Sequence, residues 1–149
     1  MSNLSGQNPN LAPSAQVPRR ADALDDLLVI GTFAAISQDT NGTGIAFKAE
    51  DVEGYHAVVS YLSHASNATN NWTIIIQGAD NSSYTSPVTL ASIVLASGVT
   101  KKEYLALEGA AVRSLMRAAG RGEATHIRAI ADETLSPGAL TAKVYLTCD

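Results

Sequence analysis

The residues best able to do chemistry in this sequence are three histidines and one cysteine, and they are far apart. His56 and His64 stand eight residues apart, so in one extended strand they would share a face but lie about 26 Å from each other. His126 falls in a third strand-like region, and Cys148 has no second cysteine with which to pair. A zinc cage needs several such ligands at close spacing, and a nucleophilic thiol needs a placed base. The sequence therefore predicts no metal, no cofactor and no catalytic residue.

Acidic residues form short runs, at Asp25–Asp26, Glu50–Asp51 with Glu53, and Asp132–Glu133. Neighbours in a strand point to opposite faces, so such pairs are poor acid–base partners, and we interpret them as solvated turn residues. The segment Asp39–Gly44 has some features of a calcium loop, but it has a glycine too early and a threonine where a carboxylate or amide is needed. We expect a plain hairpin loop there.

Phosphate-binding and nucleic-acid-binding patterns are missing from the sequence. It contains no GxxxxGK[ST] or GxGxxG motif, no GxSxG, no HExxH and no CxxC. The net charge of −4, from 14 acidic and 10 basic residues, is opposite in sign to that of a typical nucleic-acid-binding domain. The basic residues that could form a stripe are Arg113, Arg117, Arg121 and Arg128. No aromatic residues that would stack on bases lie between them, so we interpret them as a salt-bridged helix face or a subunit contact.

Short segments rich in β-branched and aromatic residues, separated by turn formers, predict about eight strands. They are Leu28–Ile36, Ile45–Ala49, His56–Ser63, Trp72–Gly78, Val88–Ala96, Glu103–Leu107, Thr125–Ala131 and Ala139–Thr147. Within Val88–Ala96 we expect Val88 and Leu90 on one face and Thr89, Ala91 and Ile93 on the other. This number of short strands is typical of a β-sandwich or a barrel.

One segment has helical periodicity, and the most regular strands suggest a core. Ala110–Ala119 spaces its larger apolar side chains as one helical face and has a glycine on either side, so we expect one short helix inserted between late strands. The side chains expected to be largely buried are Ile74, Ile76, Leu90, Val144 and Leu146. Trp72 heads an apolar run, and we expect it in the core as well.

The first 22 residues differ in composition from residues 23–149, which we predict to form the β-sandwich domain. Three of the five prolines, Pro9, Pro13 and Pro18, lie in this segment and forbid a helix there. The composition is compatible with a disordered tail or with an extended arm that orders against another subunit. We favour the arm, whose twenty residues could reach roughly 60 Å. The side chains proposed to bind a partner are Leu4, Leu11, Val17, Arg19 and Arg20.

Two stretches together resemble a known family. Ile74–Leu95 contains a strand, the loop DNSSYTSP and an alternating strand, and Thr125–Leu146 contains a strand with Arg128, a Gly/Pro turn and a closing strand. This order is similar to that of the small jelly-roll cement, or decoration, proteins on the capsids of tailed bacteriophages. Their loop of the type D-x-S-F/Y-x-x-P is matched by Asp80, Ser82 or Ser83, Tyr84 and Pro87. A later Y-L/I-R strand is matched by His126-Ile127-Arg128, with His126 in place of the aromatic residue.

The resemblance implies an all-β, jelly-roll-like sandwich and a structural, non-enzymatic role. The expected partner is the major capsid protein, bound on the outer surface of the shell, with the protein itself a dimer or trimer there. No direct nucleic-acid partner is expected. With no apolar run long enough to span a bilayer and no secretory leader pattern, we expect synthesis in the host cytoplasm and location in the virion. The alternative is a carbohydrate-binding β-sandwich of a phage or bacterial surface, with Trp72 or Tyr84 as a sugar platform. An enzyme on a cupin-like jelly roll is disfavoured, since no His-x-His pair occurs.

Overall fold

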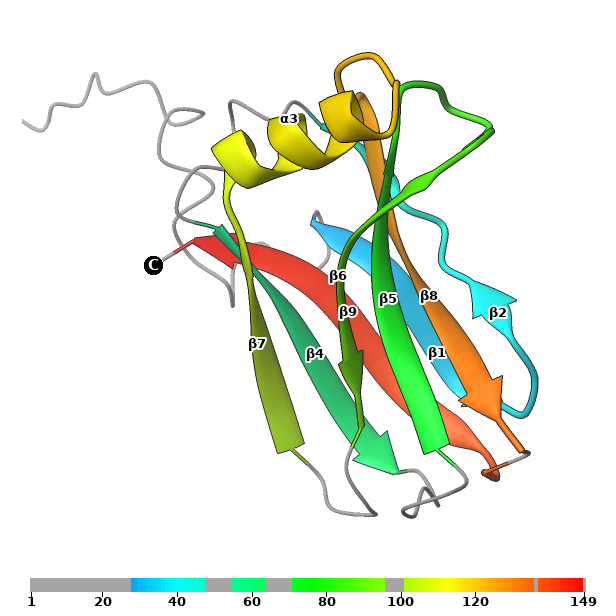
Figure 1. Ribbon diagram of the computed structural model, residues 1–149. Helices are drawn as coiled ribbons and strands as arrows, with labels where there is room; N and C mark the ends of the chain where they lie inside the picture. Colours follow the sequence, from blue (N-terminus) through cyan, green and yellow to red (C-terminus); the bar gives the residue numbers. More distant parts are fainter. Residues whose placement is uncertain (1–27, 48–54, 64–70, 96–100, 136, 149) are drawn as a thin grey trace, which may run out of the picture.

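The protein forms a sandwich of two antiparallel sheets in a computed structural model that describes residues 28–47, 55–63, 71–95, 101–135 and 137–148 (Figure 1). One sheet has the strand order β1-β9-β4-β7, and the other has β2-β8-β5-β6, with β3 also paired to β8. The strands are β1 (Val29–Ile36), β2 (Thr40–Asn41), β3 (Ile45–Ala46), β4 (Tyr55–Ser63), β5 (Asn71–Ala79), β6 (Val88–Val94), β7 (Lys101–Leu107), β8 (His126–Thr134) and β9 (Leu140–Cys148). The predicted all-β sandwich is confirmed.

The strand pairs are nested around the middle of the chain. β5 pairs with β6, β4 with β7, β2 and β3 with β8, and β1 with β9, all antiparallel. If β2 and β3 are taken as one interrupted strand, the chain is a single long hairpin of eight strands wound into two sheets. This arrangement is the jelly roll. It accounts for why strands far apart in sequence, such as β1 and β9, are neighbours.

The core lies between the sheets and follows the two-residue alternation of the strands. In β5, Trp72, Ile74 and Ile76 are fully buried while the residues between them are half-exposed. β8 has the same pattern with smaller side chains, so Ile74 pairs with Ala131 and Ile76 with Ala129. Large residues thus face small ones across the pair, and each buried isoleucine contributes about 1.5–3 kcal/mol. The indole N–H of Trp72 donates to the carbonyl of Gly138 (2.9 Å), so its one polar group is satisfied.

A single helix, α3 (Gly109–Ala118), is described between β7 and β8, and it lies across one end of the sandwich (Figure 1). Its apolar face buries Val112 and Met116 in the same core cluster as the sheets. The helix ends at a left-handed glycine, Gly120 (φ 73°), where the Gly120 amide donates to Arg117 and the Arg121 amide to Met116. These two bonds form a Schellman motif, which closes the helix and turns the chain back toward β8.

The predicted strands and helix are confirmed to within a few residues, with two differences. β2 was not expected, because it is only two residues long and is held by pairing with β8. The strict alternation expected for Val88–Ala96 is wrong. In β6 the register shifts so that Ile76 pairs with Ala91 but Gln77 pairs with Thr89, which leaves Leu90 as a bulge. The bulge switches faces, so Val88, Leu90, Ala91 and Ile93 all pack on the core while only partly buried.

Four of the five side chains expected in the core are there. Ile74, Ile76 and Val144 are fully buried, and Leu146 is 1% exposed. Leu90 is half-buried at the bulge and packs against the cluster from its edge.

Candidate functional site

The loop between β5 and β6, residues 80–87, is the segment that carries the resemblance, and the structure gives it a defined shape. It lies at the same end of the sandwich as α3 (Figure 1). Tyr84 and Ser86 both have positive φ angles, 54° and 51°. Such angles are unfavourable for residues with a side chain and need support from their surroundings.

Asn81 supplies that support from inside the loop. Its side-chain oxygen accepts from the amides of Ser83 (3.1 Å) and Thr85 (2.9 Å). Its side-chain nitrogen donates to the carbonyl of Thr85 (3.1 Å) and to the Asp80 carboxylate (2.9 Å). The Asn81 side chain therefore forms four hydrogen bonds and closes the loop on itself, as Asx turns do. The loop is a rigid structural element.

Tyr84 connects the tip of the loop to β8. The guanidinium carbon of Arg128 lies 4.3 Å from the centre of the tyrosine ring, a cation–π contact. The ring of His126 meets the same tyrosine edge-on, with the centres 6.1 Å apart. Arg128 in turn donates from Nε to the side-chain oxygen of Gln77 on β5 (3.1 Å). The resemblance pairs the loop tyrosine with the later arginine in sequence, and the structure brings the two side chains into contact.

The hydroxyl of Tyr84 points at the backbone of Gly44. A side chain at Gly44 would collide with this hydroxyl and with the carbonyl of Ile127, and Gly44 has a positive φ of 76°. The hydroxyl is buried and has no hydrogen-bond partner among the described residues. Burial raises the pKa of Tyr84, and the nearby Arg128 charge only partly offsets this. Tyr84 is therefore neutral at physiological pH and acts as a packing and stacking group.

Asp80 fastens the loop to the turn that follows α3. Its second carboxylate oxygen accepts from the amide of Gly122 (3.0 Å). The hydrogen bonds from Asn81 and from the Gly122 amide hold the pKa of Asp80 below its ordinary value of 3.8. Desolvation opposes them, and the nearby Arg121 charge lowers the pKa by less than desolvation raises it. The carboxylate is thus ionised and engaged, which suits a structural link.

The chemistry available at this end of the molecule is recognition by shape, stacking and charge. Its arginine, tyrosine, asparagine and aspartate side chains are held to one another by the contacts above. Across the described ranges, no group of three or more histidine, cysteine, aspartate or glutamate residues is arranged to hold a metal ion. The same part of the chain has no helix long and apolar enough to cross a bilayer.

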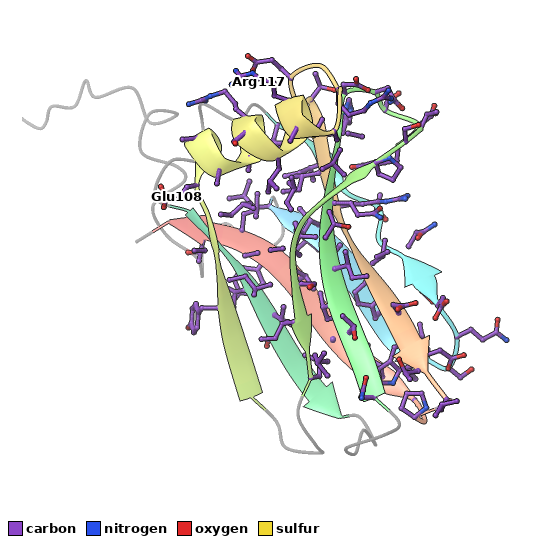
Figure 2. All side chains as sticks on the ribbon, in the orientation of Figure 1. Glu108 and Arg117 are labelled. Carbon is purple, nitrogen blue, oxygen red and sulfur yellow. The ribbon has the colours of Figure 1, made fainter. Side chains whose placement is uncertain are left out.

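Three arginines line a cavity beside this loop. Arg113 and Arg117 lie one turn apart on α3, and the Schellman turn brings Arg121 back to the same place. Together with Met116, Gly122 and Glu123 they line a cavity of about 230 Å³. Figure 2 marks Glu108 at the start of α3 and Arg117 near its end. The three arginines lie together as the sequence grouped them, but the expected salt bridges are not formed with any carboxylate of the described residues. Arg128, which the sequence grouped with these residues, instead contacts Tyr84.

Acidic residues gather at the other end of β8. Ser37, Gln38, Asp39 and Glu133 line a polar cavity of about 490 Å³. The Asp39 carboxylate accepts from the amide of Glu133 (2.7 Å), which makes Asp39 part of the β8 edge rather than of a calcium loop. Burial, together with the neighbouring Asp39 carboxylate, raises the pKa of Asp132. Asp132 and Glu133 lie within β8, so their assignment to a solvated turn was wrong.

The remaining candidate residues from the sequence do not form a common site within the part of the chain that the structure describes. The proposed arm residues, Leu4, Leu11, Val17, Arg19 and Arg20, lie outside the described residues, as does His64. Trp72 is fully buried, which confirms its place in the core and removes it as a sugar platform. Cys148 ends β9.

A row of apolar residues crosses the outer face of the β1-β9-β4-β7 sheet, and it was missed from the sequence. Val29 pairs with Tyr145, Tyr145 with Val58, and Val58 with Tyr104. Their sequence neighbours in β4 and β9 belong to the core, so Val58 and Tyr145 point to the opposite face. Both are almost fully buried, 1% and 3% exposed, while Tyr104 at the sheet edge is 61% exposed. Val58 and Tyr145 are therefore shielded from solvent on this outer face, whereas Tyr104 at its edge is solvated.

Comparisons of the chain with protein families, with curated proteins and with solved structures gave no match.

Proposed function

We propose that this chain is a virion structural protein that binds the outside of a major capsid protein shell and stabilises the head of a tailed bacteriophage. In this role it has no enzymatic activity and needs no cofactor. It bridges neighbouring shell subunits, adding buried interface that resists the outward force of the packaged genome. The sandwich supplies a rigid body, and residues 1–22 supply an arm that extends the contact.

The contact between the loop tyrosine and the later arginine carries the proposal. The resemblance to decoration proteins depends on two sequence stretches, and an aromatic residue of one stretch contacts a basic residue of the other. Tyr84 and Arg128 are 44 residues apart and meet at 4.3 Å. The jelly-roll strand order agrees with the fold that the resemblance implies. The same fold occurs in capsid proteins, lectins and cupins, so fold alone does not decide among them.

The outer face of the β1-β9-β4-β7 sheet supports the proposed arm. Its apolar row begins at Val29, the first residue of β1, and the arm precedes β1 in the chain. A surface of this kind suits an extended segment with widely spaced apolar side chains, such as Leu4, Leu11 and Val17. The arm would provide contact area beyond the sandwich, and its prolines lower the entropic cost of ordering it.

Deletion of residues 2–18 tests this function. The truncated protein is expected to fold as a sandwich and to unfold at nearly the same temperature as the full chain in isolation. It is also expected to bind capsid shells more weakly in co-sedimentation, because the arm contacts have been removed. Undiminished occupancy and unchanged heat resistance of the shells would contradict the role of the arm. Failure of the full-length protein to bind shells would contradict the proposed function itself.

A further inference from the structure

The three arginines beside α3 have no carboxylate partner among the described residues. Arg113 and Arg121 are half-buried and Arg117 is exposed around their cavity of about 230 Å³. Asp80 is near enough to Arg121 to feel its charge, but its oxygens are already bonded to Asn81 and Gly122. Glu123, also at the cavity, is exposed and forms no ion pair with them within the described ranges. Three positive charges thus converge at a cavity that is lined by one carboxylate residue, Glu123.

The surroundings of this cavity favour carboxylates over phosphate. A phosphate site usually draws on free backbone amides at a helix N-terminus, where the helix dipole attracts anions. This cavity lies at the C-terminal end of α3, where the dipole opposes a concentrated negative charge, and the nearby Gly122 amide is already used by Asp80. Carboxylates spread over a protein surface can instead pair one by one with the planar guanidinium groups.

The opposite end of the same sandwich offers such carboxylates. Glu133 has a side-chain oxygen that is buried and without a hydrogen-bond partner among the described residues. It lines the polar cavity of about 490 Å³ with Asp39, which is exposed. Asp132, beside them, has a raised pKa because burial and the Asp39 charge oppose its ionisation. Asp39 and Glu133 thus place two carboxylates at this end of the sandwich, with Asp39 exposed.

The two clusters mark opposite ends of β8. The arginine cavity lies just before His126, where β8 begins, and Glu133 is the next-to-last residue of the strand. Seven residues of extended chain separate them by about 23 Å. The clusters therefore lie at opposite ends of one molecule, too far apart to neutralise each other within it (Figure 1).

We propose that the arginine cavity of one copy, formed by Arg113, Arg117 and Arg121, receives Glu133 and Asp39 of a second copy, so that molecules associate end to end. Because the two surfaces differ, the contact is heterologous, and it closes into a ring or continues as a chain. The inference deepens the proposed function and rests on it, because the resemblance implies a dimer or trimer on the shell. Its experiment uses the isolated protein, so the outcome is independent of shell binding.

The experiment measures self-association by analytical ultracentrifugation over a range of protein concentrations. The full-length protein is expected to associate at low salt and to dissociate toward monomer at about 0.5 M salt, where screening acts within a few ångström. Arg117→Glu and Glu133→Arg are each expected to weaken association at least about tenfold, since each places like charges together. The double variant with both substitutions is expected to recover most of that loss. Glu108→Arg, at the start of α3 and outside both clusters, changes the charge as Glu133→Arg does and serves as the control.

Three results would overturn the proposal. One is a protein that stays monomeric at low salt and high concentration. Another is an association that neither Arg117→Glu nor Glu133→Arg weakens more than Glu108→Arg does. The third is a double variant that associates no better than the single variants, although circular dichroism shows it folded. Titration with inorganic phosphate gives a separate readout: strong chemical-shift changes at Arg113, Arg117 and Arg121 without self-association would assign the cavity to phosphate instead.

Discussion

Replacing Asn81 with alanine should weaken the loop of residues 80–87 without altering the core. The substitution removes four hydrogen bonds, two from backbone amides, one to a backbone carbonyl and one to the Asp80 carboxylate, at 2.9 to 3.1 Å. It also leaves the positive φ angles of Tyr84 and Ser86 without their main support. These hydrogen bonds are partly solvated, so each contributes at the low end of the usual range, and the total is about 2 kcal/mol. For a domain of this size that loss corresponds to a fall in Tm of roughly 4–8 °C.

Thermal and urea unfolding of Asn81→Ala measure this loss, with Ser82→Ala as the matched control. Ser82 is exposed in the same loop, and its side chain forms no hydrogen bond with any described residue. The control should unfold within about 0.5 kcal/mol of the parent protein, as surface substitutions usually do. If Asn81→Ala unfolds at the same temperature as Ser82→Ala, Asn81 does not hold the loop. The description of the loop as a rigid element would then be refuted.

Three further substitutions test the core, the close approach of the tyrosine and the acid stability. Leu146→Ala should cost about 2–5 kcal/mol by urea unfolding, because Leu146 is 1% exposed in the central strand β9, whereas Val94→Ala at an exposed edge should cost far less. Gly44→Ala should destabilise the protein by more than Gly120→Ala, because both glycines have positive φ but only Gly44 abuts Tyr84. Equal Tm values for the two variants would contradict this packing. The pKa of Asp80 is lowered in the folded state, so its contribution is present above the ordinary value of 3.8 and is lost as the pH falls toward the folded value. Asp80→Asn should therefore flatten the acid limb of the stability curve, and an unchanged limb would exclude this link.

The sequence was most informative where alternation is regular and long. β5 and β9 each run for nine residues, and the buried positions of Ile74, Ile76, Val144 and Leu146 were predicted from the regular pattern of these strands. It was least informative where one residue changes the register. The bulge at Leu90 arises from the pairing of β6 with β5, and pairing between strands leaves no mark in the pattern of one strand. β2 likewise exists only through its partner β8.

The candidate site was predictable only in part for a similar reason. The loop motif and Arg128 could be picked out as residue types, but the contact of Tyr84 with Arg128 depends on which strands become neighbours. The roles of Asn81 and Gly44 depend on loop geometry that composition does not encode. The apolar row through Tyr145 and Val58 was hidden, because buried residues on both faces of a strand read as one continuous apolar run.

Electron cryo-microscopy of capsid particles produced together with this protein would show whether it binds the outer surface of the shell. If the proposal is correct, extra density appears at regular positions on the outer surface of the capsid shell. Each density feature accommodates the two-sheet sandwich with α3 at one end. Shells made with the variant lacking residues 2–18 should show weaker density at the same positions. Particles that are complete in every other component but show no density outside the major capsid protein would contradict the proposed binding.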